Sequence, residues 1–337
     1  MFCVFIAQRM RKPSSSARLA NCVFIERTNA DTNCRWWKSS TPQQRLMRLD
    51  AIIEKVLRMS FEEFTRNVSM DEIRHLCETT TNILREQPVL VEIQPPVVVC
   101  GDIHGQFSDL KTIFTRVGHP PDKKYIFLGD IVDRGSQNLE TAVLLFCYKA
   151  RFPDRFILLR GNHECSRINR NYGFLGEITC RYGQQNAHEI WMLFNNTFAW
   201  LPFTALIGGR ILCMHGGLCS SMNSLQQFRE FRRPMLDPPN PSLELDVLWA
   251  DPQPGLRGVR PSPRKAGVLF GEDVVINLCQ LLGLQMIVRA HQCVANGFEY
   301  FAGRRLLTIF SAPGYSRRNT GATLTIDENF RRSFEFF

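Results

Sequence analysis

Six short polar segments of this sequence each follow an apolar run, and their side chains are of types that bind metals and phosphate. In the first segment, Gly101 follows the apolar residues 97–100 and is followed by Asp102 and His104. Because these two residues are two apart on a turn, both side chains can point at one place above the strand end. A carboxylate oxygen and a neutral imidazole suit a divalent transition metal. Alone the pair is a weak signal, but the same construction recurs five times.

The other five segments also contain histidine, aspartate, asparagine, arginine or tyrosine. They are GDIVDRG at 129–135, RGNHE at 160–164, HGGL at 215–218, RAHQ at 289–292 and SAPGY at 311–315. Each follows apolar residues that are expected to form a strand. In open α/β sheets the binding site lies beyond the carboxyl ends of the strands. The six loops can therefore converge on one place.

Six side chains of these loops are candidate metal ligands: Asp102, His104, Asp130, Asn162, His215 and His291. They offer oxygen and nitrogen donors without a thiolate, and six ligands are too many for one tetrahedral zinc. Two adjacent metals that share one carboxylate would use all six, and Asp130 is a reasonable bridge because it follows a glycine at a strand end. Such a pair, about 3.5–4 Å apart, can deprotonate a shared water and clamp an in-line displacement.

Further side chains on the same loops suit phosphate chemistry. His163 directly follows Asn162, so the backbone sends their side chains in different directions, and Asp133 could hold the His163 imidazole by a hydrogen bond. An oriented, protonated histidine beside a metal-bound hydroxide is a general acid for a poor leaving group such as an alkoxide. Arg134 and Arg160 carry planar guanidinium groups that match phosphate oxygens.

Each of these residues also has a purely structural interpretation. A single buried histidine is usually a hydrogen-bonded core residue, Asp133 and Arg134 could form a solvated turn, and Asn162 could be a left-handed turn residue. The metal interpretation is favoured because four of the seven histidines follow the ends of apolar strands, namely His104, His163, His215 and His291. His119 and His188 lie outside such loops and are expected at the surface.

Composition narrows the class of protein. The 337 residues are 44% hydrophobic, which is enough for a large core, and no apolar run approaches the roughly 18 residues of a membrane span. The 12 cysteines mostly lie in apolar runs without a CxxC pair, which predicts reduced thiols in an intracellular protein. Of the formal charge of +9, residues 1–45 carry +6, so the remainder is nearly balanced and no nucleic-acid-binding face is expected.

The elements that must position the six loops can also be outlined. Residues 1–45 are basic and Ser-rich, and they are expected to be a disordered extension, with a mitochondrial presequence as the alternative. A helical pattern starts at Gln44, and a capping box of Ser69 and Glu72 predicts a helix over 70–86. Helices are also expected over 107–117 and 138–150. Only loops and helices are expected between the six strand units, with residues 234–264 as a surface excursion.

With these motifs in this order, residues 46–337 resemble the metal-dependent serine/threonine protein phosphatases, and most closely the type-1 catalytic subunits. The motifs that carry the resemblance are GDIHGQ, GDIVDRG, LRGNHE, HGGL, RAHQ and SAPGY. The resemblance implies one catalytic domain with an α+β fold, the calcineurin-like metallophosphoesterase fold. In that fold a central β-sandwich is flanked by helices and two metal ions lie at its edge.

The resemblance also implies a role for each matching residue. The first metal would be held by Asp102, His104 and Asp130, and the second by Asp130, Asn162, His215 and His291. His163 matches the general acid, and Asp133 matches its partner. The positions that contact phosphate are Arg134, Asn162, Arg264 and Tyr315. Arg160 matches a residue that is not usually assigned to phosphate, and it is left out of the site.

The function implied is that of a phosphoprotein phosphatase. A hydroxide activated by two divalent ions (Mn, Fe or Zn) would attack the phosphorus of phosphoserine or phosphothreonine in one step, with His163 as the general acid. Phosphoproteins and regulatory subunits are the expected partners, nucleic acid and membrane are not, and the cytoplasm or nucleus is the expected compartment. Two alternatives remain, namely an esterase for small phosphates and a phosphatase-fold scaffold without activity.

Several positions depart from the pattern of the family. The loop after Tyr315 is shorter and basic, and Ser316 stands where the family has a cysteine that some toxins attack. The segment 253–265 is basic as well, which leads to the hypothesis that acidic stretches near the phosphosite are favoured. In the groove where type-1 subunits dock regulators, Tyr300 and Phe330 keep apolar character. Arg331 and Arg332 replace apolar neighbours there.

Overall fold

The structure is a computed structural model that describes residues 41–316 and 318–337. The predictions of a disordered extension or a presequence fall mainly on residues 1–40, which lie outside the described residues. The expected disorder is wrong at residues 42–45, because these residues belong to the helix Pro42–Arg58. The domain boundary at residue 45 stays a prediction. None of the described helices is long and apolar enough to cross a membrane.

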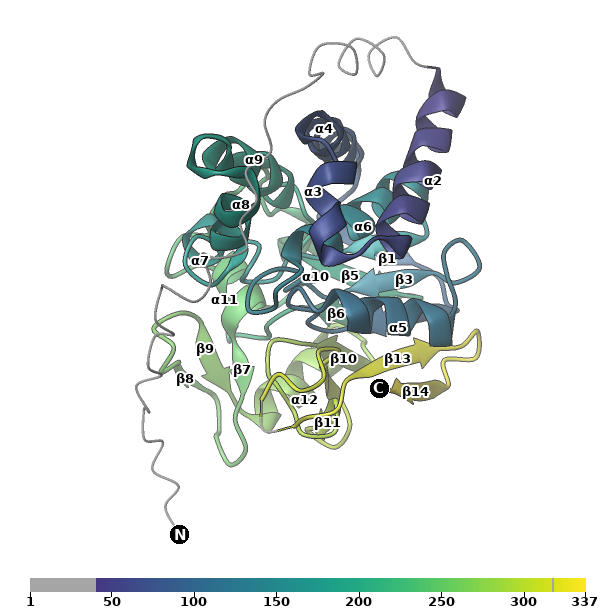
Figure 1. The fold of residues 1–337 in the computed structure, drawn as a ribbon. Coiled ribbons are helices and arrows are strands. Elements are labelled where there is room, and N and C mark those ends of the chain that lie inside the picture. The colour runs from purple at the N-terminus through teal and green to yellow at the C-terminus, as the bar shows by residue number, and fades with distance from the viewer. Residues whose placement is uncertain (1–40, 317) are drawn as a thin grey trace.

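Two sheets form the centre of the molecule (Figure 1). One sheet contains, in spatial order, β1 (Leu90–Ile93), β5 (Thr204–Ile207), β6 (Ile211–Met214), β10 (Met286–Arg289), β12 (Leu306–Ile309) and β11 (Phe298–Phe301). The other contains β14 (Arg332–Phe336), β13 (Ala322–Ile326), β2 (Val97–Cys100), β3 (Tyr125–Phe127) and β4 (Phe156–Leu158). Apolar side chains from both sheets, such as Val99 and Ile309, form one buried cluster, so the two sheets are the halves of a β-sandwich.

The six strands that precede the polar motifs form two parallel triplets, one in each sheet. In the first sheet β10 lies between β6 and β12 and runs parallel to both, and in the second β3 lies in the same way between β2 and β4. The carboxyl ends of the strands of a parallel triplet all emerge at the same edge of the sheet. This arrangement brings the six polar loops together.

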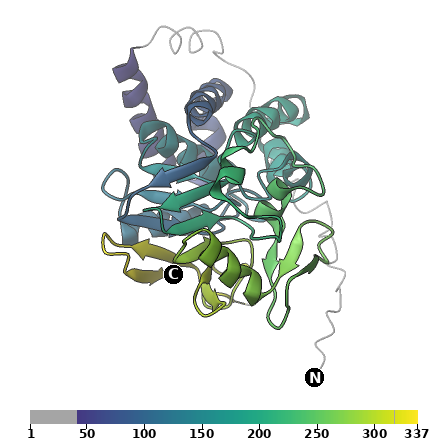
Figure 2. The ribbon, with the colours of Figure 1, turned by 180° about the vertical axis from the view of Figure 1, so that it is seen from behind.

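Helices cover the outer faces of the sandwich. They are, in the described part of the chain, α2 (Pro42–Arg58), α3 (Phe64–Asn67), α4 (Met70–Glu86), α5 (Phe107–Val117), α6 (Asn138–Arg151), α7 (Ser166–Asn169), α8 (Phe174–Tyr182), α9 (Gln184–Phe198), α10 (Leu225–Arg229), α11 (Leu243–Trp249) and α12 (Glu272–Leu281), together with a 3₁₀ turn at Phe61–Glu63. The helices from the N-terminal part lie at one end and strands β13 and β14 at the other, in the front view and from behind (Figure 2).

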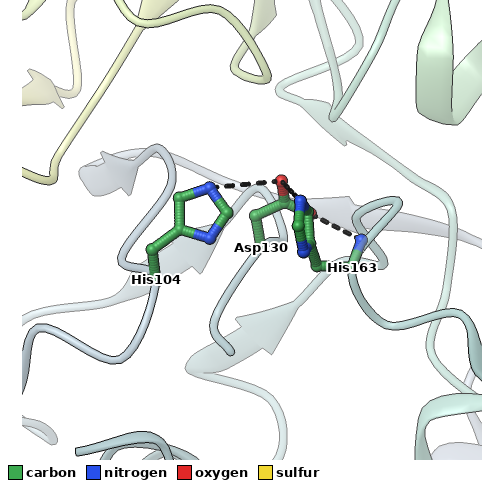
Figure 3. A group of neighbouring side chains, drawn as sticks. All are labelled: His104, Asp130 and His163. Carbon is green, nitrogen blue, oxygen red and sulfur yellow. Dashed lines mark hydrogen bonds and ion pairs between the residues drawn. The ribbon is translucent and has the colours of Figure 1, made fainter. Parts of the chain in front are cut away.

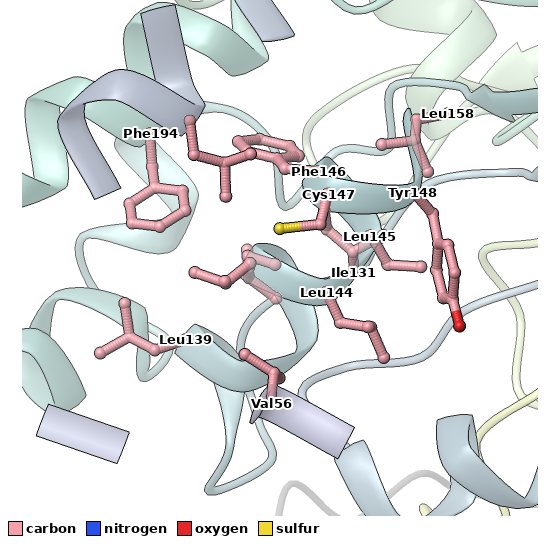
Figure 4. Packing of buried hydrophobic residues seen from close by; sticks show 14 of the residues in the cluster. Val56, Ile131, Leu139, Leu144, Leu145, Phe146, Cys147, Tyr148, Leu158 and Phe194 are labelled. Atoms are coloured by element: carbon pink, nitrogen blue, oxygen red, sulfur yellow. The ribbon is translucent and has the colours of Figure 1, made fainter. Parts of the chain in front are cut away.

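Helix α6 is the central element of the largest core. Its residues from Asn138 to Ala150 are all buried, because α2, α4 and α8 surround it on the side away from the sheet. Side chains such as Leu144 and Phe146 pack against Val56 and Phe194 of the surrounding helices (Figure 4). A helix that is apolar on most sides is typical of such a fully enclosed position.

The predicted elements match closely where a strong local signal exists. The capping box of Ser69 and Glu72 is present at the start of α4, and α5 has the predicted bounds. Helix α2 begins at Pro42 instead of Gln44, because Thr41 and Gln44 form a capping box of their own.

The expectation of only loops and helices between the six strand units is wrong. Strand β5 lies in such an interval and forms an antiparallel hairpin with β6. A third, three-stranded sheet contains β7 (Asp251–Pro252), β9 (Val268–Phe270) and β8 (Val259–Pro261), so part of the expected surface excursion is strand. Strands of two or three residues are too short to give a periodic pattern.

The cysteines mostly behave as expected. Eight of the nine cysteines in the described ranges carry free thiols, and seven of these are buried. Cys180 lies exposed on α8 and is disulfide-bonded, so the prediction of reduced thiols is wrong at this residue.

Candidate active site and metal centre

Asp130 lies at the centre of the site, just beyond the end of β3. Its Oδ2 atom is 3.3 Å from His215 Nε2, 3.6 Å from His104 Nε2 and 3.9 Å from His163 Nε2. Figure 3 shows the His104 and His163 rings on either side of the Asp130 carboxylate. The three imidazoles come from three different loops, and all four residues are buried. The predicted convergence on Asp130 is therefore present in the structure.

Asn162 connects the second group of candidate ligands. Its Oδ1 atom is 2.9 Å from His215 Nε2, 3.0 Å from His291 Nδ1 and 3.1 Å from Asp130 Oδ2. Asp130 Oδ2 is an acceptor, and a neutral His215 that donates from Nδ1 to the Leu128 carbonyl has only a lone pair on Nε2, so the amide oxygen then faces no donor. Either the amide turns over and its NH₂ donates to them, or a cation lies between the lone pairs. The second arrangement is that of a metal site with oxygen and imidazole ligands.

Asp102 joins the two groups of ligands. Its Oδ2 is 3.5 Å from His104 Nε2, and its Oδ1 accepts a hydrogen bond of 3.0 Å from the backbone N–H of His291. All six residues that the sequence singled out as ligands are thus linked to one another through short contacts.

Backbone carbonyls orient two of the imidazoles. The Nδ1 atoms of His104 and His215 lie 3.0 Å and 3.1 Å from the carbonyl oxygens of Val132 and Leu128. An imidazole that donates from Nδ1 keeps the lone pair of its Nε2 free for a metal. His291 differs, because its Nδ1 faces Asn162 and its Nε2 has no hydrogen-bond partner. Each ring therefore presents one nitrogen to the centre.

Several of these residues have a backbone conformation that is unusual for a side chain with a Cβ atom. The φ angles of His104, Asp130 and His291 are 49°, 53° and 67°, and those of Asp133 and Arg134 are 74° and 72°. Left-handed conformations cost non-glycine residues roughly 1 kcal/mol or more each and persist where the surroundings over-determine them. Their concentration at the carboxyl ends of the strands marks this place as functional.

Glycines allow the strand ends to approach so closely. A Cβ atom on Gly129 would lie 2.2 Å from the backbone nitrogen of Gly161, and one on Gly161 would lie 2.3 Å from that of Asp130. The loops after β3 and β4 therefore pack backbone against backbone, which sets the position of the Asp130 carboxylate.

The electrostatics of the site favour positive charge around Asp130. Burial opposes ionisation of Asp130, but the charges of His215 and His163 hold the pKa of this carboxyl well below its usual value. Burial likewise disfavours protonated His104, yet Asp102 and Asp130 raise its pKa to about 9. Burial and the nearby His215 charge keep the pKa of His291 well below its usual value, so this ring is neutral as metal binding requires. The donors present fit divalent cations.

His163 is oriented differently from the ligands. Its Nδ1 lies 2.7 Å from Asp133 Oδ2, and the other Asp133 oxygen accepts the backbone N–H of Phe174 at 2.9 Å. The His163 ring is nearly perpendicular to that of His104, at 4.8 Å between centroids. Its Nε2 atom points toward Asp130, so geometry alone would also allow His163 to take part in metal binding.

Three residues were expected to contact the phosphate without binding a metal, namely Arg134, Arg264 and Tyr315. They lie at the rim of the site and are more exposed than the six candidate ligands. The guanidinium carbon of Arg134 lies 4.3 Å from the centroid of the Tyr172 ring. Arg264 donates from Nε to Asp251 Oδ2 at 2.7 Å, and its side chain is 41% exposed. The ring of Tyr315 stacks on His104 at 4.9 Å with an interplanar angle of 13°.

Sequence reasoning missed a layer of supporting residues. The buried Glu164 carboxylate accepts the backbone N–H groups of Asp130, Ile131 and Gly161 at 2.8–2.9 Å. Asp251 pairs with Arg289 at 2.9 Å in addition to Arg264. Glu164 is the last residue of RGNHE, but a motif alone does not show which backbone groups a carboxylate accepts.

Arg160 is placed as the resemblance implied. It is buried and donates to the carbonyl oxygens of Glu164, Met235 and Leu236. It fixes the loop after β4 and does not take part in the site.

Comparison with known proteins settles the family. Residues 95–295, more than half of the chain, match the calcineurin-like phosphoesterases. The chain belongs to that family. It is 45% identical over 293 residues to the serine/threonine-protein phosphatase PP1-delta of Caenorhabditis elegans, an alignment that covers 86% of this chain and 95% of the relative. The fold class and the resemblance to serine/threonine protein phosphatases are confirmed.

Solved structures agree with this metallophosphoesterase fold. A Saccharomyces cerevisiae protein serine/threonine phosphatase with similarity to human PP5 superposes with a TM-score of 0.74 at 32% identity, over 83% of this chain and 96% of that one. A cold-active protein-tyrosine phosphatase of a psychrophilic Shewanella has a TM-score of 0.53 at 19% identity, over 76% and 84% of the two chains. The second likeness shows the fold alone.

Proposed function

We propose that this metallophosphoesterase is a protein serine/threonine phosphatase that cleaves phosphoserine and phosphothreonine in one step. The observation that carries the proposal is the convergence of six oxygen and imidazole donors around Asp130, with the His163–Asp133 pair beside them. The protein phosphatases among its relatives support the choice of phosphoproteins over other phosphate esters.

Two divalent cations fit the donor set. One would be held by Asp102, His104 and Asp130, and the other by Asp130, Asn162, His215 and His291. When bound, such ions act as Lewis acids on the phosphoryl group and on water. Manganese, iron and zinc all suit these ligands, since none is a thiolate.

The other residues of the site would bind the substrate and move a proton. Arg134 and Arg264 can pair with the phosphoryl oxygens, because guanidinium groups match phosphate geometry. Asn162 and Tyr315 border the same space. His163 would protonate the departing seryl or threonyl oxygen from Nε2, while Asp133 holds Nδ1 and stabilises the protonated ring. No residue is needed as a nucleophile, so no phosphoenzyme is expected.

The proposal also covers the domain boundaries, the partners and the compartment of the protein. We propose that residues 46–337 are the catalytic domain and residues 1–45 an extension. Phosphoproteins are the substrates, regulatory subunits are partners, and the protein acts in the cytoplasm or nucleus.

Hydrolysis of three substrates tests the proposal. A phosphoprotein, a small aryl phosphate and a dinucleotide polyphosphate would be compared in the presence of manganese. Activity on the phosphoprotein is expected in the wild type and lost in His163→Ala and Asp102→Asn, while the exposed control His188→Ala keeps it. Faster hydrolysis of the dinucleotide polyphosphate would favour an esterase for small phosphates. No hydrolysis of any of the three substrates would favour a phosphatase-fold scaffold without activity.

A further inference from the structure

Three buried polar side chains form a hydrogen-bonded network behind His163. Asn169 is the last residue of α7, and Trp191 and Asn195 lie one turn apart on α9. The exposed fractions of Asn169, Trp191 and Asn195 are 0%, 5% and 1%. Buried polar groups are costly unless they find partners, so the partners of these three side chains indicate what the network does.

The amide of Asn169 uses all of its hydrogen-bonding capacity. Its Oδ1 accepts from Trp191 Nε1 at 2.6 Å and from Asn195 Nδ2 at 3.2 Å. Its Nδ2 donates to Asn195 Oδ1 at 2.9 Å and to the backbone carbonyl oxygen of His163 at 3.1 Å. A side-chain amide has two lone pairs and two N–H groups, so every one of them is paired here.

The indole of Trp191 determines which way this amide faces. An indole N–H can only donate, so the atom of Asn169 that lies against it must be the oxygen. The NH₂ group then faces His163, whose carbonyl oxygen can only accept. Asn195 is fixed as well, because its Nδ2 donates to the carbonyl oxygen of Trp191 at 2.9 Å. Helix α9 therefore holds a donor against His163 in one defined orientation.

His163 is held on both sides of the bond from which its side chain branches. Its backbone N–H donates to Asp130 Oδ1 at 2.9 Å, and its carbonyl oxygen accepts from Asn169. These two bonds set the position of the Cβ atom, while the contact of 2.7 Å between Nδ1 and Asp133 Oδ2 sets the rotation of the ring. Without Asn169, the carbonyl side of His163 would lose its anchor, and the ring could tilt.

We propose that Asn169 is a positioning residue for His163, and that Trp191 and Asn195 act through it. The inference rests on the proposed function, in which His163 protonates the leaving oxygen. A general acid contributes about 10²–10⁴-fold to the rate, and a misplacement of about 1 Å can cost about 10²-fold. Asn169 is buried and does not touch the substrate, so its loss should slow the proton transfer and leave the metal centre in place.

The leaving group separates this role from a purely structural one. If the network only ties α7 to α9, its loss lowers every activity alike. If it positions His163, the loss depends on whether the leaving oxygen needs a proton. A seryl alkoxide needs one, whereas a nitrophenolate leaves without one. We define the leaving-group ratio as kcat for a phosphoserine peptide divided by kcat for a nitrophenyl phosphate.

Variants of the full chain, assayed with manganese, test the inference. Asn169→Leu removes the donor at a similar side-chain volume, and the leaving-group ratio should fall by about tenfold or more. Trp191→Phe keeps an aromatic ring without the indole N–H, and a smaller fall of about threefold is expected because Asn169 stays in place. Thr197→Val is the matched control on α9. It removes a buried hydroxyl that donates to the carbonyl oxygens of Cys77 and Leu193, and the ratio should not change.

Two outcomes would overturn the positioning role. One is an unchanged ratio in Asn169→Leu, including equal losses on both substrates, and the other is a ratio that falls as far in Thr197→Val. If Asn169→Leu does not fold, as judged by circular dichroism and its urea midpoint, Trp191→Phe decides by the same ratio.

Failure of the proposed function gives a different result. The wild type would then not hydrolyse the phosphoserine peptide, or His163→Ala would leave the leaving-group ratio unchanged. A ratio that falls in His163→Ala but not in Asn169→Leu refutes the positioning role alone.

Discussion

The hydrogen bond between Asp133 and His163 is the residue-scale contact on which acid catalysis depends. In Asp133→Asn the amide cannot stabilise a protonated His163, so kcat for a phosphoserine peptide should fall by about 10²-fold or more. The loss should be much smaller for an aryl phosphate, whose leaving group needs no proton. Rates on both substrates check this, with Asp122→Asn, an exposed aspartate, as the control. Equal losses on both substrates would contradict the role of His163 as the acid.

Glu164 acts through the backbone on the position of Asp130. In Glu164→Gln one acceptor oxygen becomes an NH₂ group that faces buried N–H donors, and an unsatisfied buried donor costs about 1–3 kcal/mol. The free energy of unfolding in urea should fall by that amount, and the metal content per chain should fall as well. The exposed Glu62→Gln is the matched control. An unchanged urea midpoint with full metal content would refute this supporting role.

At this scale the sequence predicts the ligands better than the residues that hold them. Asp102, His104 and Asp130 follow strand ends in motifs that recur, which is a local signal. Glu164 and Asp251 act on groups that the fold brings near, and Asp251 pairs with an arginine 38 residues away. No spacing in the sequence reports such a contact.

At the scale of elements, two parallel triplets of strands explain how six loops reach one site. The strands of the triplets were predicted because each is a compact apolar run that ends in a polar motif. Strands β13 and β14 are followed by no such motif and are not predicted from the sequence. Strand β5 lies in a segment for which only helices and loops are expected. Their pairing is set by distant partners, as in the antiparallel contact of β13 with β2.

Helix α6 contains a buried charge that makes stability depend on pH. Burial lowers the pKa of Lys149 from 10.5 to about 7, and its Nζ donates to the carbonyl oxygen of Pro153 at 2.8 Å. The unfolded lysine titrates near 10.4, so between pH 7 and 10 the unfolded state binds more protons and stability rises with pH. Lys149→Met removes this dependence.

The stability gained by Lys149→Met, relative to the wild type, should therefore be largest below pH 7. At pH 6.5 Lys149→Met should be more stable than the wild type by about 2 kcal/mol. At pH 10 the advantage should vanish, because the neutral lysine keeps its hydrogen bond, worth about 1 kcal/mol. Urea unfolding at both pH values measures the difference, with the exposed Lys123→Met as the control. The same difference at both pH values would contradict the assigned pKa direction.

At the scale of the whole molecule, basic side chains gather near the active site. Arg257, Arg260 and Lys265 are exposed on and beside β8, and no ion pair involves them within the described residues. Arg264, in the same segment, is tied through Asp251 to the rim of the metal centre. A substrate bound at the site would therefore meet positive charge beyond its phosphate.

Substrate choice should follow this charge. An exposed ion pair contributes about 0.2–1 kcal/mol, so two or three acidic residues beside the phosphoserine should raise kcat/KM about fivefold over a peptide with basic flanks. The advantage should shrink in 0.5 M salt, because screening acts on exposed charges. Arg260→Glu should lower it, whereas Arg66→Glu, far from the site on α3, should not. Equal rates on the two peptides at low salt would show that the positive charge of residues 253–265 does not select substrates.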